Sequence, residues 1–305
     1  MRLQDKLTQY LDYCIYRKEL DQKTVKAYRI DLNQYFAFVS CEEPSKEKIE
    51  EYITELHKKY KQKTVKRKIA SVKAYYNYLE DEEFIKENPF LRIKVKFKET
   101  LILPKIIPRE EIEHLLNYMY TCLSQASETM YKYCLRDVAV IEIFFATGAR
   151  VYEISNLQAE SVNLNTGLIK IMGKGAKERY IQIGSTSVLD ILRKYYAENK
   201  YAIKKCGFFF VNGRGERYTE QSIRWMLKKY TSQAGIERNI TPHMFRHSFA
   251  TYLVEEGVDI SCVQRILGHS SIKTTQIYIH IAARKQAEIL RDMHPRNNMN
   301  IVGAA

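Results

Sequence analysis

The spacing of apolar residues in the first 90 positions restricts the fold more than any other feature. Apolar side chains recur every three or four residues in the successive segments 3–20, 24–40, 45–60 and 63–84. This period places them on one face of an α-helix, and such a face is stable when it packs against another element. Residues 1–90 are therefore expected to form a small helical bundle.

A proline-rich stretch interrupts this pattern between residues 87 and 108. It contains Pro89, Pro104 and Pro108, and its apolar residues lose the helical spacing. Proline removes a backbone donor and disfavours helix in the residue before it, so an extended connection is expected. We place a first domain at residues 1–97, a linker at 98–108 and a second domain at 109–305.

The period changes again inside the second domain. Helical spacing at 109–123 and 133–148 gives way at 161–184 to short alternating runs of β-branched residues, divided by the turn sequences NTG and GKGAKE. This pattern predicts a small antiparallel sheet. Helical spacing returns by residue 185. The expected fold is mainly α, of the α+β type, with a helical N-terminal bundle and a mostly helical C-terminal domain that includes this sheet.

Basic residues outnumber acidic ones, 49 against 36, which gives a formal charge of +13. The excess is clustered, because residues 58–68, KKYKQKTVKRK, include seven Lys or Arg and no acid. Such clustering favours a polyanionic partner, although a Lys-rich run can also be a solvated helix face. We expect contacts with nucleic-acid phosphates from Lys63, Lys66, Arg67 and Lys68.

Composition argues against several other classes. No apolar run reaches the roughly 20 residues of a membrane span, and the N-terminus lacks the apolar core of a signal peptide. Six cysteines are scattered without a CxxC pair, which favours reduced thiols over a zinc ribbon or a disulfide framework. We expect a cytoplasmic protein that has no contact with membranes and needs no metal and no cofactor.

A helix with unusual chemistry is predicted at 241–257, TPHMFRHSFATYLVEEG. Thr241 is a good N-cap, Pro242 suits the first helical position, and Gly257 can end the helix in the left-handed conformation.

Two imidazoles and a guanidinium share one face near the start of this helix. His243 lies three residues before Arg246 and four before His247. The backbone N–H groups at a helix N-terminus already favour an anion, so the pattern indicates a phosphate site or a solvated basic helix end. A metal site is disfavoured, because the zincin motif requires Glu directly after the first His and this chain has Met244.

Other segments each hold one group that suits phosphate chemistry. Arg150 and Glu153 lie three apart in ARVYEISNL, where a surface ion pair is the alternative. Lys174 lies between two glycines in GKGAKE; the Walker pattern is absent, so ATP is not implied. His269 and Tyr278 follow in GHSSIKTTQIY.

Together these segments resemble the tyrosine recombinase (phage integrase) family. The resemblance follows the family order through ATGARVYEISNL, GKGAKERYIQI, HMFRH and LGHSSIKTTQIY. The basic N-terminal bundle is similar to the family's core-binding (SAM-like) domain. The resemblance implies a catalytic set with two supporting residues: Arg150, Lys174, His243, Arg246, His269 and Tyr278, supported by Glu153 and His247.

The resemblance also implies a reaction, the cleavage and rejoining of DNA strands through a 3′-phosphotyrosine at Tyr278. Two arginines would bind the non-bridging phosphate oxygens, because a guanidinium stays charged and can donate two parallel hydrogen bonds. His269 would add a hydrogen bond, His243 would accept the tyrosine proton, and Lys174 would protonate the leaving 5′ oxygen. The covalent intermediate conserves the bond energy, so ATP is not required. The arginines neutralise the phosphate charge, and nothing in the sequence suggests a Mg²⁺ for that role.

Family members act as tetramers, which implies partners for this chain. The partners are double-stranded DNA with inverted half-sites and three further copies of the chain. The resemblance also implies a nucleoid-associated location. The short amphipathic segment 281–293 would dock into a neighbouring protomer, or else pack within its own chain. The sequence leaves open a partner recombinase or accessory protein, and the choice between chromosome-dimer resolution and transposon or phage integration.

Other functions remain as alternatives. A type IB topoisomerase uses similar residues to relax supercoils, and a catalytically idle DNA-binding regulator would keep the fold. A nuclease is disfavoured, because the sequence has no clustered carboxylates of the metal-dependent type.

Overall fold

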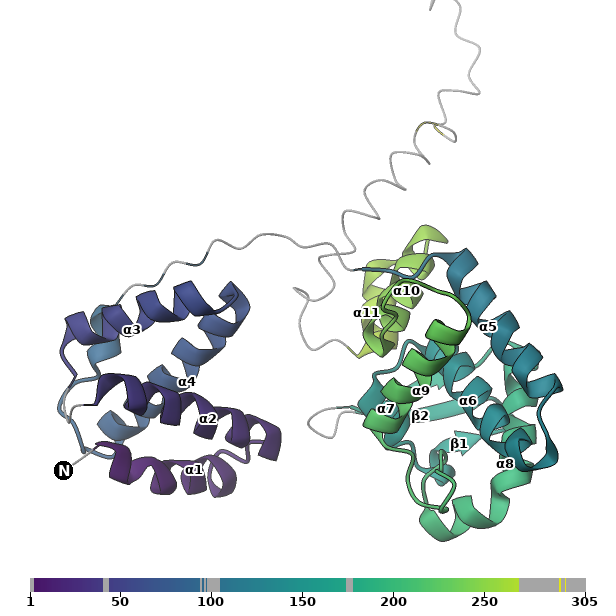
Figure 1. Ribbon diagram of the computed structural model, residues 1–305, viewed down its shortest axis with the longest axis horizontal. Helices are drawn as coiled ribbons and strands as arrows, with labels where there is room; N and C mark the ends of the chain where they lie inside the picture. Colours follow the sequence, from purple (N-terminus) through teal and green to yellow (C-terminus); the bar gives the residue numbers. More distant parts are fainter. Residues whose placement is uncertain are drawn as a thin grey trace, which may run out of the picture. The chain divides into compact units, whose positions relative to one another are not determined.

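The computed structural model describes residues 3–40, 44–93, 95, 97, 105–173, 178–268, 291 and 294. The chain divides into two compact units, Met1–Thr100 and Leu101–Ala305, and each unit has its own hydrophobic core (Figure 1).

All regular secondary structure in the described part of the first unit is helical. In this unit α2 packs against α1, α3 and α4. Asp21 and Ser45 cap α2 and α3, because their side chains accept hydrogen bonds from backbone N–H groups of the first turn. The elements are η1 (Leu3–Lys6), α1 (Leu7–Tyr16), α2 (Gln22–Val39), α3 (Lys46–Lys59), α4 (Gln62–Asp81) and η2 (Pro89–Arg92).

Tyrosine rings fill much of the bundle core. Tyr10 and Tyr75 are almost fully buried and meet edge to face, with ring centroids 5.0 Å apart. The hydroxyls of Tyr35 and Tyr76 hydrogen-bond to each other at 2.9 Å, which satisfies two polar groups inside the core.

The second unit combines helices with one small sheet, which confirms the predicted fold class. Its central helix α6 packs against α5, α8 and α10 (Figure 1). The described elements are α5 (Arg109–Ser124), α6 (Glu128–Thr147), α7 (Val151–Ser155), η3 (Ala159–Ser161), β1 (Val162–Asn163), β2 (Leu168–Met172), β3 (Glu178–Gln182), α8 (Thr186–Cys206), α9 (Glu220–Gln233), α10 (Pro242–Glu255) and α11 (Ile260–Leu267).

The sheet is antiparallel, in the order β1-β2-β3. Ile169 pairs with Ile181, and Ile171 pairs with Arg179. The three isoleucines are buried, so this face of the hairpin packs on the core of the unit. Residues 173–177 connect β2 to β3, and 174–177 lie outside the described residues.

The end of α6 fixes the course of the chain into α7. Gly148 terminates α6 with φ +58°, in the left-handed region that the predicted helix stop requires. A Cβ at this position would lie 2.4 Å from Cδ1 of Phe249 in α10, so only glycine allows α10 to pack this closely. Arg150 then begins α7 as its N-cap residue.

Two local features differ from the sequence-based expectation. Thr241 occupies the N-cap position of α10, but its side chain makes no capping hydrogen bond within the described structure. Ile107, which falls in the predicted linker, is fully buried, and its N–H donates to Ser248 Oγ at 2.8 Å. The last residues before α5 are therefore part of the second unit. Among the described residues, no helix is long and apolar enough to cross a membrane.

Candidate active site

Arg150 is held at the turn between α6 and α7. Its backbone N–H donates to Glu153 Oε2 at 2.7 Å, and its Nη1 donates to Glu153 Oε1 at 2.8 Å. The backbone bond is one half of a capping box, in which the residue at the third helical position reaches back to the N-cap. The Arg150 side chain keeps 36% of its surface exposed, which leaves donors available to a ligand.

Glu153 is buried, and a second arginine shares its carboxylate. Arg179 of β3 donates from Nη1 to Oε1 at 3.0 Å and from Nη2 to Oε2 at 2.6 Å. Burial raises the pKa of Glu153, but the hydrogen bonds and charge of Arg179 and the hydrogen bonds from Arg150 outweigh burial, so the pKa lies below its ordinary value. Glu153 is therefore an anion that can orient Arg150.

Arg246 reaches the same region from α10. It is buried, and it donates from Nη1 to the carbonyl of Gly148 at 2.8 Å and from Nη2 to the carbonyl of Leu267 at 2.6 Å. Gly148 lies two residues before Arg150, so the two predicted arginines flank the same turn. Leu267 ends α11, so Arg246 also fixes the end of this helix.

The two histidines of α10 differ in exposure. His243 is exposed, whereas His247 is half-buried. Burial lowers the pKa of His247, and the charges of His243 and Arg246 lower it further. His247 is therefore neutral at pH 7, with one ring nitrogen that can donate a hydrogen bond and one that can accept.

Three predicted catalytic residues, Lys174, His269 and Tyr278, lie outside the described residues, as does the segment 281–293 apart from Arg291. The elements that lead to two of them are described. Residue 174 comes two positions after the end of β2, and His269 comes directly after Gly268, the C-cap residue of α11.

Arg179 is a functional candidate that the sequence motifs did not reveal. The alternation of Arg179, Ile181 and Ile183 in ERYIQI placed an arginine on the apolar face of a predicted strand. A charge at such a position needs a buried partner, and this was the available signal.

The basic residues predicted to bind DNA separate into two groups on α4. Lys63, Lys66 and Arg67 are exposed, although Arg67 Nη1 also donates to Asp31 Oδ2. Lys68 is buried, and its Nζ donates to Asp31 Oδ1 at 2.9 Å. The basic run 58–68 contains no acidic residue, but in the folded unit Asp31 of α2 lies against it.

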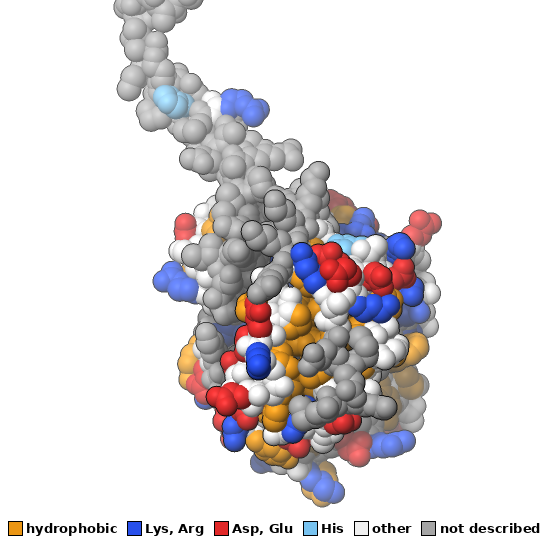
Figure 2. Space-filling model, turned by 90° about the vertical axis from the view of Figure 1, so that its left-hand side faces the viewer, with side chains coloured by type: hydrophobic (Ala, Val, Ile, Leu, Met, Phe, Trp, Pro, Cys, Tyr) orange, Lys and Arg blue, Asp and Glu red, His pale blue; other side chains and the backbone are white. Residues whose placement is uncertain are grey.

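The surface of the first unit is mixed in charge. Lys48 pairs with Glu51 and Lys58 with Glu55, each at 2.9 Å. On the face drawn in Figure 2, basic and acidic side chains are interspersed, with hydrophobic side chains between them. Charges of both signs therefore lie side by side on α3 and on the face that Figure 2 draws.

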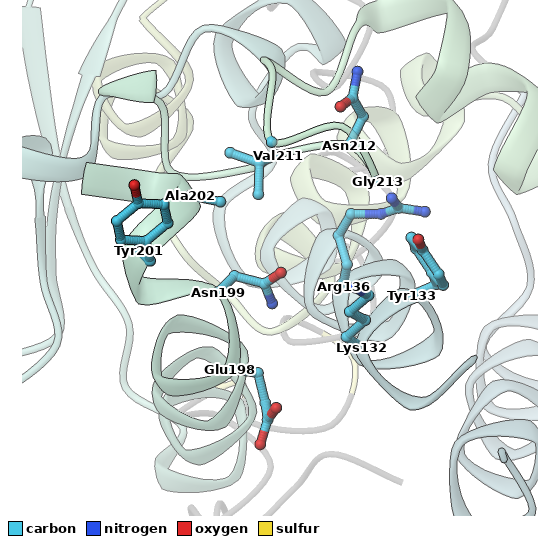
Figure 3. A pocket seen from close by; sticks show the side chains of 11 residues that line it. Lys132, Tyr133, Arg136, Glu198, Asn199, Tyr201, Ala202, Val211, Asn212 and Gly213 are labelled. Carbon is cyan, nitrogen blue, oxygen red and sulfur yellow. The ribbon is translucent and has the colours of Figure 1, made fainter. Parts of the chain in front are cut away.

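A cavity of about 190 Å³ lies elsewhere in the second unit. Side chains of α6, including Arg136, and of α8, including Asn199, lie on opposite sides of it (Figure 3). None of the predicted site residues lines it. Across the part of the chain that the structure describes, no group of three or more His, Cys, Asp or Glu could hold a metal ion.

Comparison with known proteins agrees with the motifs. Residues 105–285 match the model of the phage integrase family, and residues 7–83 match the phage integrase N-terminal SAM-like domain. A tyrosine recombinase of Agathobacter rectalis is 47% identical over 302 residues, which cover 98% of this chain and 99% of that protein. Tyrosine recombinase XerC of Leptospira interrogans is 33% identical over 300 residues, covering 96% of this chain and 94% of that protein.

A solved structure shares the fold. The XerH site-specific recombinase, in a post-cleavage complex with a palindromic difH substrate, aligns with a TM-score of 0.75 and 22% identity, covering 94% of this chain and 84% of that chain. The relatives and the family models confirm the resemblance inferred from the motifs. This chain belongs to the phage integrase family and is a tyrosine recombinase, an enzyme of site-specific DNA recombination.

Proposed function

We propose that the chain exchanges strands between two copies of a specific DNA site, through a covalent bond between Tyr278 and a 3′ phosphate. The observation that carries the proposal is the pair of anchored arginines. Arg150 is oriented by a buried carboxylate, and Arg246 is fixed by the Gly148 carbonyl at the same turn and by the Leu267 carbonyl at the end of α11. Guanidiniums held in this way can bind a scissile phosphate without reorganising during the reaction.

The proposed chemistry assigns each remaining group one role. The Tyr278 oxygen attacks phosphorus while His243 accepts its proton, and the 5′ oxygen leaves with a proton from Lys174. Arg150 and Arg246 bind the non-bridging oxygens, where the negative charge increases, and His269 adds a hydrogen bond. Losing one such donor typically costs on the order of 10²–10³ in rate. Glu153 and His247 support this set and do not react.

The proposed DNA partner is a duplex with inverted half-sites, gripped by both units. Lys63, Lys66 and Arg67 are exposed on one helix, α4, and supply phosphate contacts from the first unit. The XerH structure, which holds a palindromic substrate, supports this kind of site. From such a DNA substrate we infer a cytoplasmic protein that associates with the nucleoid.

The proposed assembly is a tetramer coupled by the segment 281–293. Strand exchange needs four sites that cut in alternating pairs, so an element must connect neighbouring protomers. Deleting residues from Ala282 onward should leave single-site binding near normal and impair pairing of two sites. If the truncated chain still exchanges strands normally, the segment packs only within its own chain and does not connect protomers.

A plasmid assay tests the function. The site is first selected from random duplexes by the protein, and plasmids with two copies, one copy or no copy are then incubated with the full chain. A recombinase yields products of exchange within one molecule only from the two-copy plasmid, and it leaves the plasmid without a copy unchanged. Relaxation of every plasmid without exchange would indicate a topoisomerase, and binding without any cleavage would indicate a regulator.

The leaving group provides a test of Lys174. A substrate with sulfur in place of the bridging 5′ oxygen needs no proton on departure, because a thiolate is a much weaker base than an alkoxide. The Lys174→Ala variant should therefore cleave ordinary DNA more slowly than wild type does. It should cleave the sulfur substrate at close to the wild-type rate. Equal defects on both substrates would remove Lys174 from the acid role.

A further inference from the structure

Arg179 occupies a position where the fold favours an apolar side chain. It is the second residue of β3 and pairs with Ile171, on the sheet face that carries Ile169 and Ile181 into the core. Its side chain is 10% exposed. A guanidinium is costly to bury unless its donors are satisfied, so this position demands fixed partners.

Those partners come from two other elements. The two Nη atoms of Arg179 grip both oxygens of Glu153 on α7, and Nε donates to the Ile266 carbonyl of α11 at 2.9 Å. The parallel pair of hydrogen bonds fixes the plane of the carboxylate as well as its position. Lysine could supply the charge at this site but not the planar fork.

Glu153 passes this constraint to Arg150. Its Oε1 accepts from Nη1 of both arginines, and its Oε2 accepts from the Arg150 backbone N–H and from Arg179 Nη2. An ionised carboxylate has about four acceptor positions, so these bonds use all of them. The carboxylate cannot rotate without breaking several bonds, and Arg150 therefore keeps one orientation.

The same guanidinium fixes the end of α11. Arg179 binds the carbonyl of Ile266, and Arg246 binds the next carbonyl, that of Leu267. Gly268 comes next with φ +64°, and a Cβ there would lie 3.1 Å from Cδ of Arg179. Arg179 thus packs directly against the turn that ends this helix.

We propose that Arg179 is a positioning residue for the reaction, which acts through Glu153 to hold Arg150 against the scissile phosphate. This inference rests on the proposed function. The competing interpretation is a buried ion pair that supports folding alone, so the test must separate misplacement of Arg150 from loss of stability.

The test variant is Arg179→Lys, which keeps the charge and removes the fork. Arg193→Lys is the control for loss of the fork alone, because Arg193 also binds a carbonyl and a carboxylate, those of Leu164 and Asp190, but lies exposed on α8. Both variants of the full chain are assayed for single-turnover covalent-complex formation on a nicked duplex of the selected site. A misplacement of about 1 Å can cost roughly 100-fold, so Arg179→Lys should lose about 100-fold in rate while Arg193→Lys changes little.

A substrate with a neutral scissile group makes the test specific. In a methylphosphonate, a methyl group replaces one non-bridging oxygen, so less negative charge faces Arg150. The defect of Arg179→Lys should shrink to less than about tenfold on this substrate, because misplacement of a guanidinium matters less when there is less charge to bind. A defect of equal size on both substrates would overturn the proposal in favour of a structural role.

Two further results complete the design. Glu153→Gln should show the same pattern, and the Glu153→Gln, Arg179→Lys double variant should be no slower than about the worse single variant, because both act on one residue. Arg179→Lys that cleaves ordinary DNA at the wild-type rate would refute the inference. Failure of the wild-type chain to form any covalent complex would instead refute the proposed function.

Discussion

Replacing Lys68 should destabilise the first unit without changing how the protein responds to salt when it binds DNA. Lys68 Nζ lies in the bundle interior, 2.9 Å from Asp31 Oδ1 and within hydrogen-bonding distance of Gln34 Oε1. Asp31 is fully buried and also binds Arg67 and the Ser71 hydroxyl. Lys68→Met therefore leaves a buried carboxylate with fewer partners.

The magnitude depends on the partners that remain. Removing one member of a buried ion pair typically costs about 3–5 kcal/mol. Arg67 and Ser71 still bind Asp31, so the lower end applies, and Lys68→Met should lose about 3 kcal/mol. Lys66→Met is the matched variant two positions away on the same helix. Its side chain is exposed, so its stability should change by less than about 0.5 kcal/mol.

Amide hydrogen exchange read by mass spectrometry separates the two units of the intact chain. A loss of about 3 kcal/mol should speed exchange of the most protected amides of α2 and α4 roughly 10²-fold in Lys68→Met, with α6 unchanged. DNA affinity measured across salt concentrations gives the second readout. Lys66→Met should lower the slope of log K against log salt by about 0.9, because one phosphate contact is lost.

The two variants have opposite expected outcomes, and each can fail separately. Lys68→Met could instead exchange its amide hydrogens at the wild-type rate and show a reduced salt slope. That result would mean that Lys68 faces DNA and that its burial against Asp31 is not maintained. An unchanged slope in Lys66→Met would make the exposed part of the basic run a merely solvated face.

Three other substitutions test separate parts of the structure. Gly148→Ala should lose at least about 1–2 kcal/mol by thermal unfolding, because its left-handed backbone disfavours a Cβ that also meets Phe249; an unchanged melting temperature would contradict this. Tyr52→Phe should leave stability unchanged or raise it, because the buried Tyr52 hydroxyl has no partner among the described residues; a clear loss would reveal a partner. The folded-state pKa of His247 lies below the ordinary 6.5, so the unfolded chain gains a proton first and stability falls as pH drops below that value. His247→Gln should lose less stability than wild type over this pH range. Identical curves of stability against pH for the two proteins would refute the lowered pKa of His247.

Features set by neighbouring residues in the chain could be predicted from the sequence. The stop of α6 at Gly148 and the start of α10 at Pro242 reflect backbone preferences, and the structure confirms both. The period of two in ERYIQI was enough to predict the strand β3. These signals depend on covalent geometry and on side-chain spacing, which the sequence states directly.

Features set by distant partners could not be predicted. Lys68 looked like a phosphate ligand because its acid partner Asp31 lies on another helix, 37 positions earlier in the chain. Arg179 looked like an ordinary strand residue because Glu153 is 26 positions away on α7. Both pairs depend on how helices and strands pack, which periodicity alone does not specify.

Every other proposed role depends on the identity of the nucleophile, which can be read by mapping the covalent complex. The full chain is trapped on a nicked duplex of its selected site, digested with protease, and the peptide joined to the DNA is sequenced by mass spectrometry. We expect one adduct, a 3′ phosphate on the oxygen of Tyr278, and none with Tyr278→Phe, which should still bind the site. An adduct on any of the other tyrosines among the 23, or a covalent complex formed by the Phe variant, would exclude Tyr278 as the nucleophile.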